Sequence, residues 1–259
     1  TQPSYVKDTS DFLKKMQSIK LPANQTCPLL LFCMDVSKLY PSVPKKEGLE
    51  ACRKALDERE IPGIPTADVM DMIQLVLENN HFGLGSSRHY LQIKGTEIGS
   101  KLGRNYACTY MGSWENELLS KCPIKPVTYL RFIDDVFGTW LGSVQGLKEF
   151  HNMANSIHQD IKVDLRYSET ELEFLDVKVG IKNNEIVTDL YAKPCDSKAY
   201  LHFTSDHPSH TKKAIPIGLA KRVRRICSSD EGFNRHADDL VGQLTDRGYP
   251  RKQTEAVIG

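Results

Sequence analysis

The chain has 259 residues, of which 40% are hydrophobic and 26% are charged, and its net charge is +1. This length and composition allow a sizeable buried core, in one large domain or in one domain with an appendage. The longest apolar run, Pro28 to Met34, is far shorter than the roughly 20 residues that span a bilayer, and no signal-like leader stands at the N-terminus. We therefore expect a soluble intracellular protein with no membrane partner.

The cysteines and the charges are unevenly spread. The seven cysteines are scattered and odd in number, which argues against a disulfide framework. Residues 191–259 carry 12 Lys and Arg against 8 Asp and Glu, whereas the rest of the chain has an excess of acidic residues. An acidic body with a basic C-terminal part is compatible with an enzyme that acts on nucleic acid, but an asymmetry of this size decides little alone.

The spacing of apolar residues predicts the order of helices and strands. From the N-terminus, the pattern predicts a helix at 11–19, a buried strand at 29–34, helices at 45–59 and 66–78, a hairpin at 82–94, a helix at 104–120, strands at 127–133 and 136–140, a helix at 147–157, strands at 162–167, 172–179 and 185–191, and helices from 208 onward. Thr66, which follows a proline, is expected to be an N-cap. This order predicts an α+β fold: a mostly antiparallel sheet with helices on one face, followed by a small helical part.

Three aspartates stand where predicted strands end. Asp35 closes the first apolar strand, and Asp134 and Asp135 occupy the turn between two others. If these strands are neighbours, the carboxylates repel one another unless divalent cations neutralise them. Magnesium binds through one or two carboxylates plus substrate phosphates, and two such ions about 3.5 to 4 Å apart support phosphoryl transfer. The plainer alternative is a turn and a strand-end cap, both of which aspartate favours.

The sequence around these aspartates resembles the catalytic motifs of reverse transcriptases. Residues 34–44 (MDVSKLYPSVP) resemble the first catalytic motif, 95–107 (GTEIGSKLGRNYA) the loop-helix motif, and 129–137 (YLRFIDDVF) the aromatic-x-Asp-Asp hairpin. Segments 172–179 and 190–194 follow in the same order, and the tail from Asp196 to Ser228 is similar to the reverse transcriptase of Penelope-like retroelements, relatives of the telomerase reverse transcriptase. Because several ordered motifs agree over about residues 4–250, the resemblance outweighs the turn-and-cap alternative.

The resemblance implies a right-hand polymerase with a palm, partial fingers and a small helical thumb. Residues 1–28 would be a remnant of the fingers or N-terminal region, 29–194 the palm and 195–259 the thumb. Asp35 and Asp134 would bridge two Mg²⁺ ions, with Mn²⁺ as an alternative. Asp135 would be the second carboxylate of the hairpin, and Val36 would offer its backbone carbonyl to a metal.

The resemblance also implies a dNTP-binding site. Tyr40 stands where reverse transcriptases place an aromatic ring against the sugar 2′ position, so it would exclude ribonucleotides; a ring in the palm core is the alternative. The further dNTP contacts that the resemblance implies are Gly95, Thr96, Gly99, Ser100 and Lys193. An exposed lysine before a proline is equally compatible with a solvated side chain. The chain departs from the family at Gly103-Arg104, where Ala-Pro or Ser-Pro is usual.

The C-terminal part adds a predicted nucleic-acid surface. The cations on one helical stretch are Lys212, Lys213, Lys221, Arg222, Arg224 and Arg225. A thumb helix needs such a stripe to follow a duplex backbone, because phosphate contacts position without reading sequence; a solvated face is the alternative. We expect Asp176 to orient the sheet edge rather than to catalyse. The spacings of Cys195, His202, His207, His210 and Cys227 match no paired-ligand pattern, so no zinc site is expected among them.

With the resemblance, these features predict an RNA-directed DNA polymerase, an enzyme that transfers a nucleotide from a dNTP to a primer 3′-hydroxyl. The expected partners are an RNA template, a DNA primer and dNTPs, and the expected location is the nucleus after cytoplasmic synthesis. We expect the full-length protein to add most of the fingers and a GIY-YIG endonuclease. One alternative is a decayed or co-opted copy that binds RNA or RNA–DNA hybrid without polymerising. A DNA-templated or primer-independent polymerase is another, which Tyr40 and the tail disfavour.

Overall fold

The computed structural model describes the chain except residues 1, 20–26, 62, 86–87, 184 and 259. The chain forms two compact units, Thr1–Val6 with Thr26–Tyr167, and Lys7–Gln25 with Ser168–Gly259. The predicted division into 1–28, 29–194 and 195–259 stays a prediction, because compact units need not coincide with functional subdomains. Among the described helices, none combines the length and the apolar character needed to cross a membrane.

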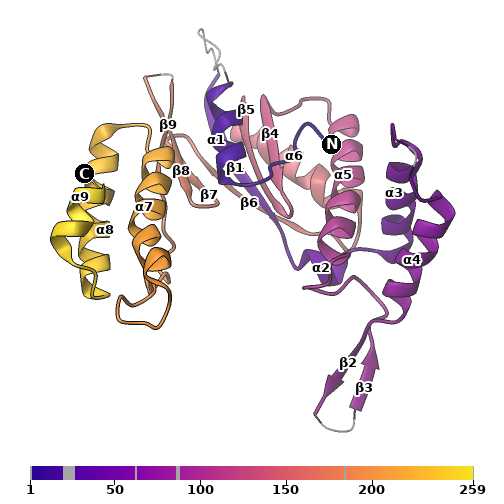
Figure 1. Cartoon of the computed structure of the whole chain (residues 1–259). Helices are drawn as coiled ribbons and strands as arrows, with labels where there is room; N and C mark the ends of the chain where they lie inside the picture. Colours follow the sequence, from indigo (N-terminus) through magenta and orange to yellow (C-terminus); the bar gives the residue numbers. More distant parts are fainter. Residues whose placement is uncertain (1, 20–26, 62, 86–87, 184, 259) are drawn as a thin grey trace. The chain divides into compact units, whose positions relative to one another are not determined.

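The first unit is built on a four-stranded sheet (Figure 1). Its strand order is β4 (Thr128–Phe132), β5 (Asp135–Leu141), β1 (Leu29–Val36) and β6 (Val163–Ser168). Strand β5 pairs antiparallel with both β1 and β4. The predicted strands at 29–34, 127–133, 136–140 and 162–167 are thus confirmed, and the most apolar of them, β1, lies inside the sheet.

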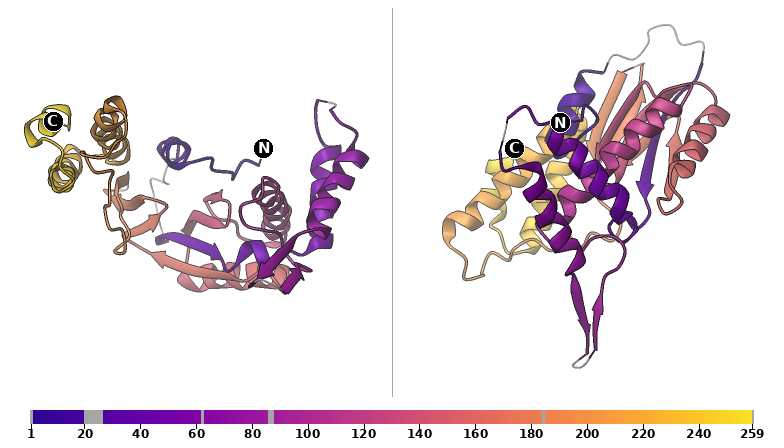
Figure 2. Two further views of the ribbon diagram at one scale, coloured as in Figure 1. Left: turned by 60° about the horizontal axis from the view of Figure 1, so that its bottom comes forward. Right: turned by 90° about the vertical axis from the view of Figure 1, so that its right-hand side faces the viewer.

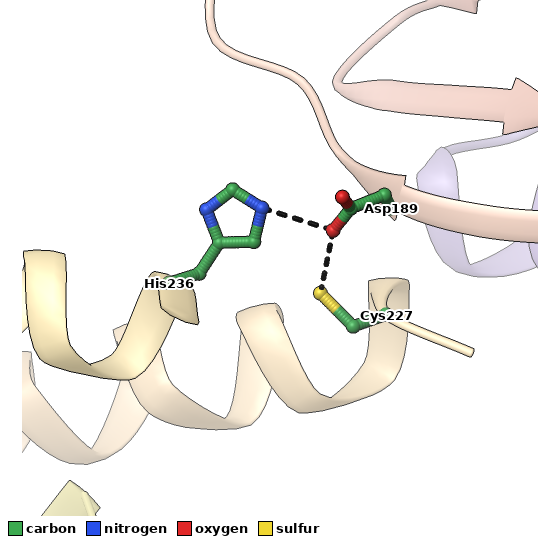
Figure 3. A group of neighbouring side chains, drawn as sticks. All are labelled: Asp189, Cys227 and His236. Carbon is green, nitrogen blue, oxygen red and sulfur yellow. Dashed lines mark hydrogen bonds and ion pairs between the residues drawn. The ribbon is translucent and has the colours of Figure 1, made fainter. Parts of the chain in front are cut away.

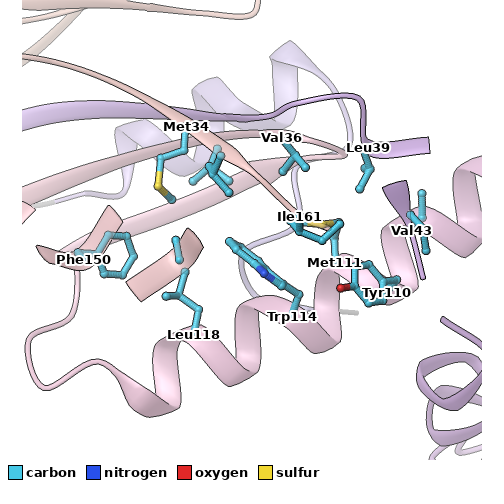
Figure 4. Packing of buried hydrophobic residues seen from close by; sticks show 14 of the residues in the cluster. Met34, Val36, Leu39, Val43, Tyr110, Met111, Trp114, Leu118, Phe150 and Ile161 are labelled. Carbon is cyan, nitrogen blue, oxygen red and sulfur yellow. The ribbon is translucent and has the colours of Figure 1, made fainter. Parts of the chain in front are cut away.

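Two helices cover one face of this sheet, α5 (Gly103–Lys121) and α6 (Val144–Ile157). Figure 4 shows the packing, in which Met34 and Val36 of β1 lie with Trp114 of α5 and Phe150 of α6 in one buried cluster. Because side chains alternate along a strand, Asp35 lies on the opposite face from Met34 and Val36. The helical core on one face therefore leaves the aspartate on the other.

Three helices and a hairpin complete the first unit. They are α2 (Leu39–Ser42), α3 (Lys45–Asp57), α4 (Thr66–Glu78), β2 (His81–Leu84) and β3 (Arg88–Leu91). The β2–β3 hairpin extends away from these helices, as the right-hand view of Figure 2 shows. Helix α4 begins at Thr66 itself, after Pro65, so the prediction that Thr66 is the N-cap is wrong by one position. The proline already fixes an extended backbone there, and no side-chain cap forms.

The second unit combines a small sheet with helices. Its elements are α1 (Thr9–Gln17), the sheet β7 (Glu171–Phe174), β8 (Val177–Lys182) and β9 (Glu185–Leu190), and the helices α7 (Ser209–Ile226), α8 (Asp230–Asp246) and α9 (Arg251–Ile258). The single strand predicted at 172–179 is wrong, because the backbone turns at Leu175, with φ of 55°, and splits it into β7 and β8. The three C-terminal helices share a core that includes Val223, Leu240 and Leu244.

Candidate active site

Two of the predicted catalytic aspartates face each other across the sheet. In the antiparallel register of β1 and β5, Asp35 is paired directly with Asp135. Directly opposite residues in an antiparallel pair project from the same face of the sheet and lie within reach of each other, and like charges at such positions are destabilising. The sequence gap of 100 residues between the two is thus closed by strand pairing, as predicted.

Asp134 lies in the tight turn that joins β4 to β5. The preceding residue, Ile133, has φ of 57°, a conformation that is unfavourable for a β-branched residue. The backbone N–H of Val36 donates to the carbonyl oxygen of Asp134 at 3.3 Å, which ties the turn to the end of β1. Strain of this kind persists only where the surrounding structure fixes the conformation, and it is concentrated at functional sites.

Burial, together with a neighbouring carboxylate, influences the ionisation of Asp134. Burial raises the pKa of Asp134 above its usual value, and the negative charge of Asp35 raises it further, while hydrogen bonds to backbone N–H groups lower it. This is the expected direction for neighbouring carboxylates. A divalent cation would remove the repulsion, and carboxylate oxygens are the ligands that Mg²⁺ prefers. The chemistry of these oxygen ligands therefore suits Mg²⁺, whose binding here stays a prediction.

The three carboxylates do not all lie close to one another. In the described part of the chain, the three carboxylates do not all come within 4.8 Å of one another. They thus do not close around one point, and the site for two ions stays a prediction.

A buried ion pair supports the turn from beneath, and sequence reasoning missed it. Arg131 of β4 donates to Glu115 of α5 at 2.7 Å, and both side chains are about 1% exposed. Arg131 also donates to the carbonyl oxygen of Ile133 at 2.9 Å, and Ser4 donates to Glu115 at 2.5 Å. The guanidinium thus holds the carbonyl next to Asp134. One charged residue on the apolar face of each element, with opposite signs, was the signal that could have revealed the pair.

Tyr40 and the loop of the second motif meet at the backbone. The N–H of Thr96 donates to the carbonyl oxygen of Tyr40 at 2.8 Å. Gly95 has φ of 74°, and a side chain there would approach the Tyr40 carbonyl oxygen to 2.4 Å, so only glycine fits. Burial raises the pKa of the Tyr40 hydroxyl, and the charge of Asp134 raises it further while Arg104 lowers it. The phenol therefore lies within electrostatic reach of Asp134.

The rest of this loop leads into α5 and accounts for the glycine of the unusual Gly103-Arg104 pair. Ser100 accepts a hydrogen bond from the N–H of Gly103 at 2.8 Å. A side chain at Gly103 would approach the carbonyl oxygen of Glu97 to 2.3 Å, which makes glycine the residue that fits. Arg104 is exposed, and its guanidinium lies 5.9 Å from the centre of the Phe132 ring. Gly99, with φ of 99°, is exposed.

The remaining predicted site residues belong to the second unit. Lys193 is exposed. Four of the six cations are held within that unit: Lys212 by the carbonyl oxygen of Ser205 and the Phe203 ring, Arg222 by Asp176, Arg224 by Asp230 and Arg225 by the hydroxyl of Ser10. Lys213 and Lys221 are exposed and make no ion pair or hydrogen bond with any described residue. The nucleic-acid role of the stripe stays a prediction.

Asp176 has a structural position in the second unit. It accepts hydrogen bonds from Thr9 of α1 at 2.5 Å and from Arg222 of α7 at 2.6 Å. It thus joins both helices to the turn between β7 and β8. These contacts agree with the expectation that Asp176 orients this edge of the sheet.

Comparisons with known proteins bear on the fold. Residues 199–258, which contain α7 to α9, match the family model described as an animal helix-turn-helix domain. No curated protein matches the chain. Telomerase from Candida albicans, solved in complex with a TWJ fragment of telomeric RNA, has a TM-score of 0.65 at 8% identity over 94% of this chain and 45% of its own.

Viral polymerases are similar as well. The RNA-dependent RNA polymerase of a human picobirnavirus has a TM-score of 0.60 at 12% identity, covering 94% of this chain and 48% of its own. The Sicinivirus 3Dpol RNA-dependent RNA polymerase has a TM-score of 0.51 at 13% identity, covering 96% and 54%. The chain spans about half the length of these proteins. The α+β polymerase fold, with its antiparallel palm sheet, is thereby confirmed.

Proposed function

We propose that the chain is the catalytic part of an RNA-directed DNA polymerase of the Penelope-like kind. The observation that carries the proposal is the register of β1 and β5, which sets Asp35 against Asp135 and beside the strained turn of Asp134, within a polymerase fold. A metal site at this place serves nucleotidyl transfer because such chemistry depends mainly on positioning and on stabilising charge.

The aspartates would hold the ions and orient them. Asp35 and Asp134 would bind both ions, Asp135 would supply a further carboxylate, and Val36 would supply its backbone carbonyl. Bound Mg²⁺ would activate the primer 3′-hydroxyl and stabilise the leaving pyrophosphate. The Arg131–Glu115 pair would keep the turn in place while metal ions bind to the carboxylates and leave them.

Other residues of the first unit would select and place the nucleotide. The hydrogen bond from the Thr96 N–H to the Tyr40 carbonyl oxygen fixes the backbone of Tyr40. From this position, the Tyr40 ring would exclude a 2′-hydroxyl. Gly95, Thr96, Gly99 and Ser100 would line the nucleotide from the loop. An RNA template and a DNA primer are the proposed partners, with Lys213 and Lys221 of the second unit as phosphate contacts and Lys193 near the triphosphate.

The test is primer extension with the whole chain. A DNA primer is annealed to an RNA template or to the same sequence as DNA, and dNTPs or NTPs are supplied with Mg²⁺; Asp35→Asn serves as the control. We expect extension on RNA with dNTPs by the wild type and none by the variant.

Other outcomes decide between the alternatives. Equal use of both templates would contradict the RNA-directed assignment. Tight binding of RNA–DNA hybrid without extension by the wild type would favour a non-polymerising copy. Imaging that finds the chain outside the nucleus would contradict the proposed nuclear location.

A further inference from the structure

A second group of potential metal ligands lies in the second unit, away from the three catalytic aspartates in sequence. Asp189 of β9, Cys227 at the end of α7 and His236 of α8 each direct a ligand atom toward one place, and these atoms all lie within 4.8 Å of one another (Figure 3). In the described part of the chain, this is the group of three His, Cys, Asp or Glu side chains that meets that spacing. We infer that these three residues bind a zinc ion.

The distances are close to those of a tetrahedral zinc site. The Cys227 sulfur lies 3.3 Å from Oδ1 of Asp189, and Nε2 of His236 lies 2.9 Å from the same oxygen. Zinc bonds of about 2.0 to 2.3 Å at tetrahedral angles place neighbouring nitrogen, oxygen and sulfur ligand atoms about 3.3 to 3.6 Å apart. Small side-chain movements would therefore admit the ion. Sulfur and imidazole ligands favour zinc over magnesium or calcium, and water would complete the four ligands.

The backbone fixes Asp189 and Cys227 opposite each other. The neighbours of these two residues are joined by hydrogen bonds: Ser228 N–H to the Thr188 carbonyl at 2.9 Å, Thr188 N–H to the Ser228 hydroxyl at 3.0 Å, and the Thr188 hydroxyl to the Ile226 carbonyl at 2.6 Å. Cys227 is buried, at 6% exposure. The site is thus built by the fold rather than by mobile surface side chains.

Helix α8 presents His236 at close range because Gly232 lies one turn earlier. A side chain at Gly232 would lie 3.2 Å from Oδ1 of Asp189, so glycine leaves room beside the carboxylate. Sequence spacing could not reveal this group, because its three residues come from separate elements. Asp189 lies in β9, Cys227 follows α7 and His236 lies in α8. Only Cys227 belongs to the set considered from the sequence.

Two residues of the group can supply the negative charge that a zinc ion needs. Zinc with the Asp189 carboxylate and a Cys227 thiolate is neutral overall. Arg235 pairs with Oδ2 of Asp189, and the N–H of Leu190 donates to Oδ1 at 2.9 Å, so the carboxylate has the outer hydrogen bonds that metal ligands usually keep. Without metal, the Cys227 thiol donates to Asp189 in place of the ion. Metal binding would displace that proton.

The test measures metal binding and needs no polymerase activity, so it stands apart from the proposed function. The whole chain is treated with a chelator and titrated with Zn²⁺, and then with Co²⁺, whose absorption reports sulfur coordination. We expect one equivalent of Zn²⁺, a higher melting temperature when it is bound, and a thiolate-to-cobalt charge-transfer band. Cys227→Ser should lose the band, whereas Cys195→Ser, at an exposed cysteine of the same unit, should keep it.

His236→Gln separates a zinc site from a hydrogen-bonded cluster. Glutamine can still donate to Asp189 but is a poor zinc ligand, so the variant should fold and bind Zn²⁺ about 100-fold more weakly or worse. This variant also decides the matter if Cys227→Ser fails to fold. The inference is overturned if the wild type binds no stoichiometric zinc, if cobalt gives no charge-transfer band, or if His236→Gln binds as the wild type does.

Discussion

Two groups of acidic side chains, one in each unit of the chain, have opposite surroundings. In the first unit, Asp35 and Asp134 have no basic side chain within ion-pair distance among the described residues. The charge of Asp35 makes the ionisation of Asp134 less favourable. In the second unit, Asp176 is paired with Arg222, and Asp189 with Arg235 and His236. The paired acids join elements together, whereas the crowded acids are the ones that we propose bind a divalent cation.

A buried ion pair of the first unit supports the turn that carries the crowded carboxylates. Arg131 and Glu115 are buried together, and Arg131 holds the carbonyl oxygen of Ile133 in the turn of Asp134. The first unit thus contains both a supporting ion pair and the carboxylates that we propose bind metal. Each of the following changes tests one side of that distinction.

The largest effect on stability is expected for Arg131→Met, which leaves Glu115 charged and buried without its partner. Breaking a buried pair in this way costs about 3 to 5 kcal/mol of the free energy of unfolding. Urea denaturation measures it. The matched control is Lys121→Met, which removes an exposed pair with Glu117 and should cost less than about 1 kcal/mol. Similar losses for the two variants would contradict the supporting role of Arg131.

Tyr40→Val tests the selectivity of the crowded site. Removal of the ring should raise the incorporation of NTPs relative to dNTPs by roughly tenfold or more, since a steric contact of this size is worth about 1 to 3 kcal/mol. The ratio of kcat/KM for the two nucleotides measures the effect. Tyr40→Phe keeps the ring and should retain the selectivity of the wild type. An unchanged ratio in Tyr40→Val would assign the ring to core packing instead.

Lys213→Ala with Lys221→Ala tests which cations of α7 contact nucleic acid. If each lysine neutralises one phosphate, the double variant should lower the slope of log affinity against log salt concentration by about 2. Binding of an RNA–DNA duplex at several salt concentrations gives the slope. Arg222→Ala is the control, because Arg222 is already paired with Asp176. A larger change in slope for Arg222→Ala than for the lysines would reverse the assignment.

The smallest effect concerns the pH dependence of Asp134→Asn. Because the pKa of Asp134 in the folded chain is raised, this group favours folding at acid pH and loses that contribution as pH rises through the raised pKa. Without divalent ions, the asparagine variant should therefore be more stable than the wild type at neutral pH, and the difference should shrink in acid. Thermal unfolding between acid and neutral pH measures it. A less stable variant at neutral pH would contradict the raised pKa of Asp134.

The sequence predicted most of the fold because the elements carry strong apolar patterns. The run that became β1 and the alternating flanks of Asp134-Asp135 placed the sheet, and strand pairing then brought Asp35 to Asp135. The split at Leu175 was missed because a leucine at positive φ leaves no glycine or proline as a signal. The Arg131–Glu115 pair and the Asp189–Cys227–His236 group were missed because each depends on tertiary packing between separate elements.

The same limit applies to the cations of α7. Their spacing on one helix suggested a continuous nucleic-acid stripe, but Arg222, Arg224 and Arg225 find partners within the second unit. Those partners lie on α1, at the β7–β8 turn and at the start of α8. A helical periodicity cannot show which of its exposed positions will meet another element.

The central claim is that the crowded aspartates are the catalytic metal site, and the rate of Mg²⁺-dependent primer extension by Asp134→Asn tests it most directly. Asparagine keeps the shape of the side chain and removes the charge that binds the ions. The account predicts a folded protein whose extension rate falls on the order of 1,000-fold or more below the wild type. A folded variant that extends the primer within tenfold of the wild-type rate would contradict it.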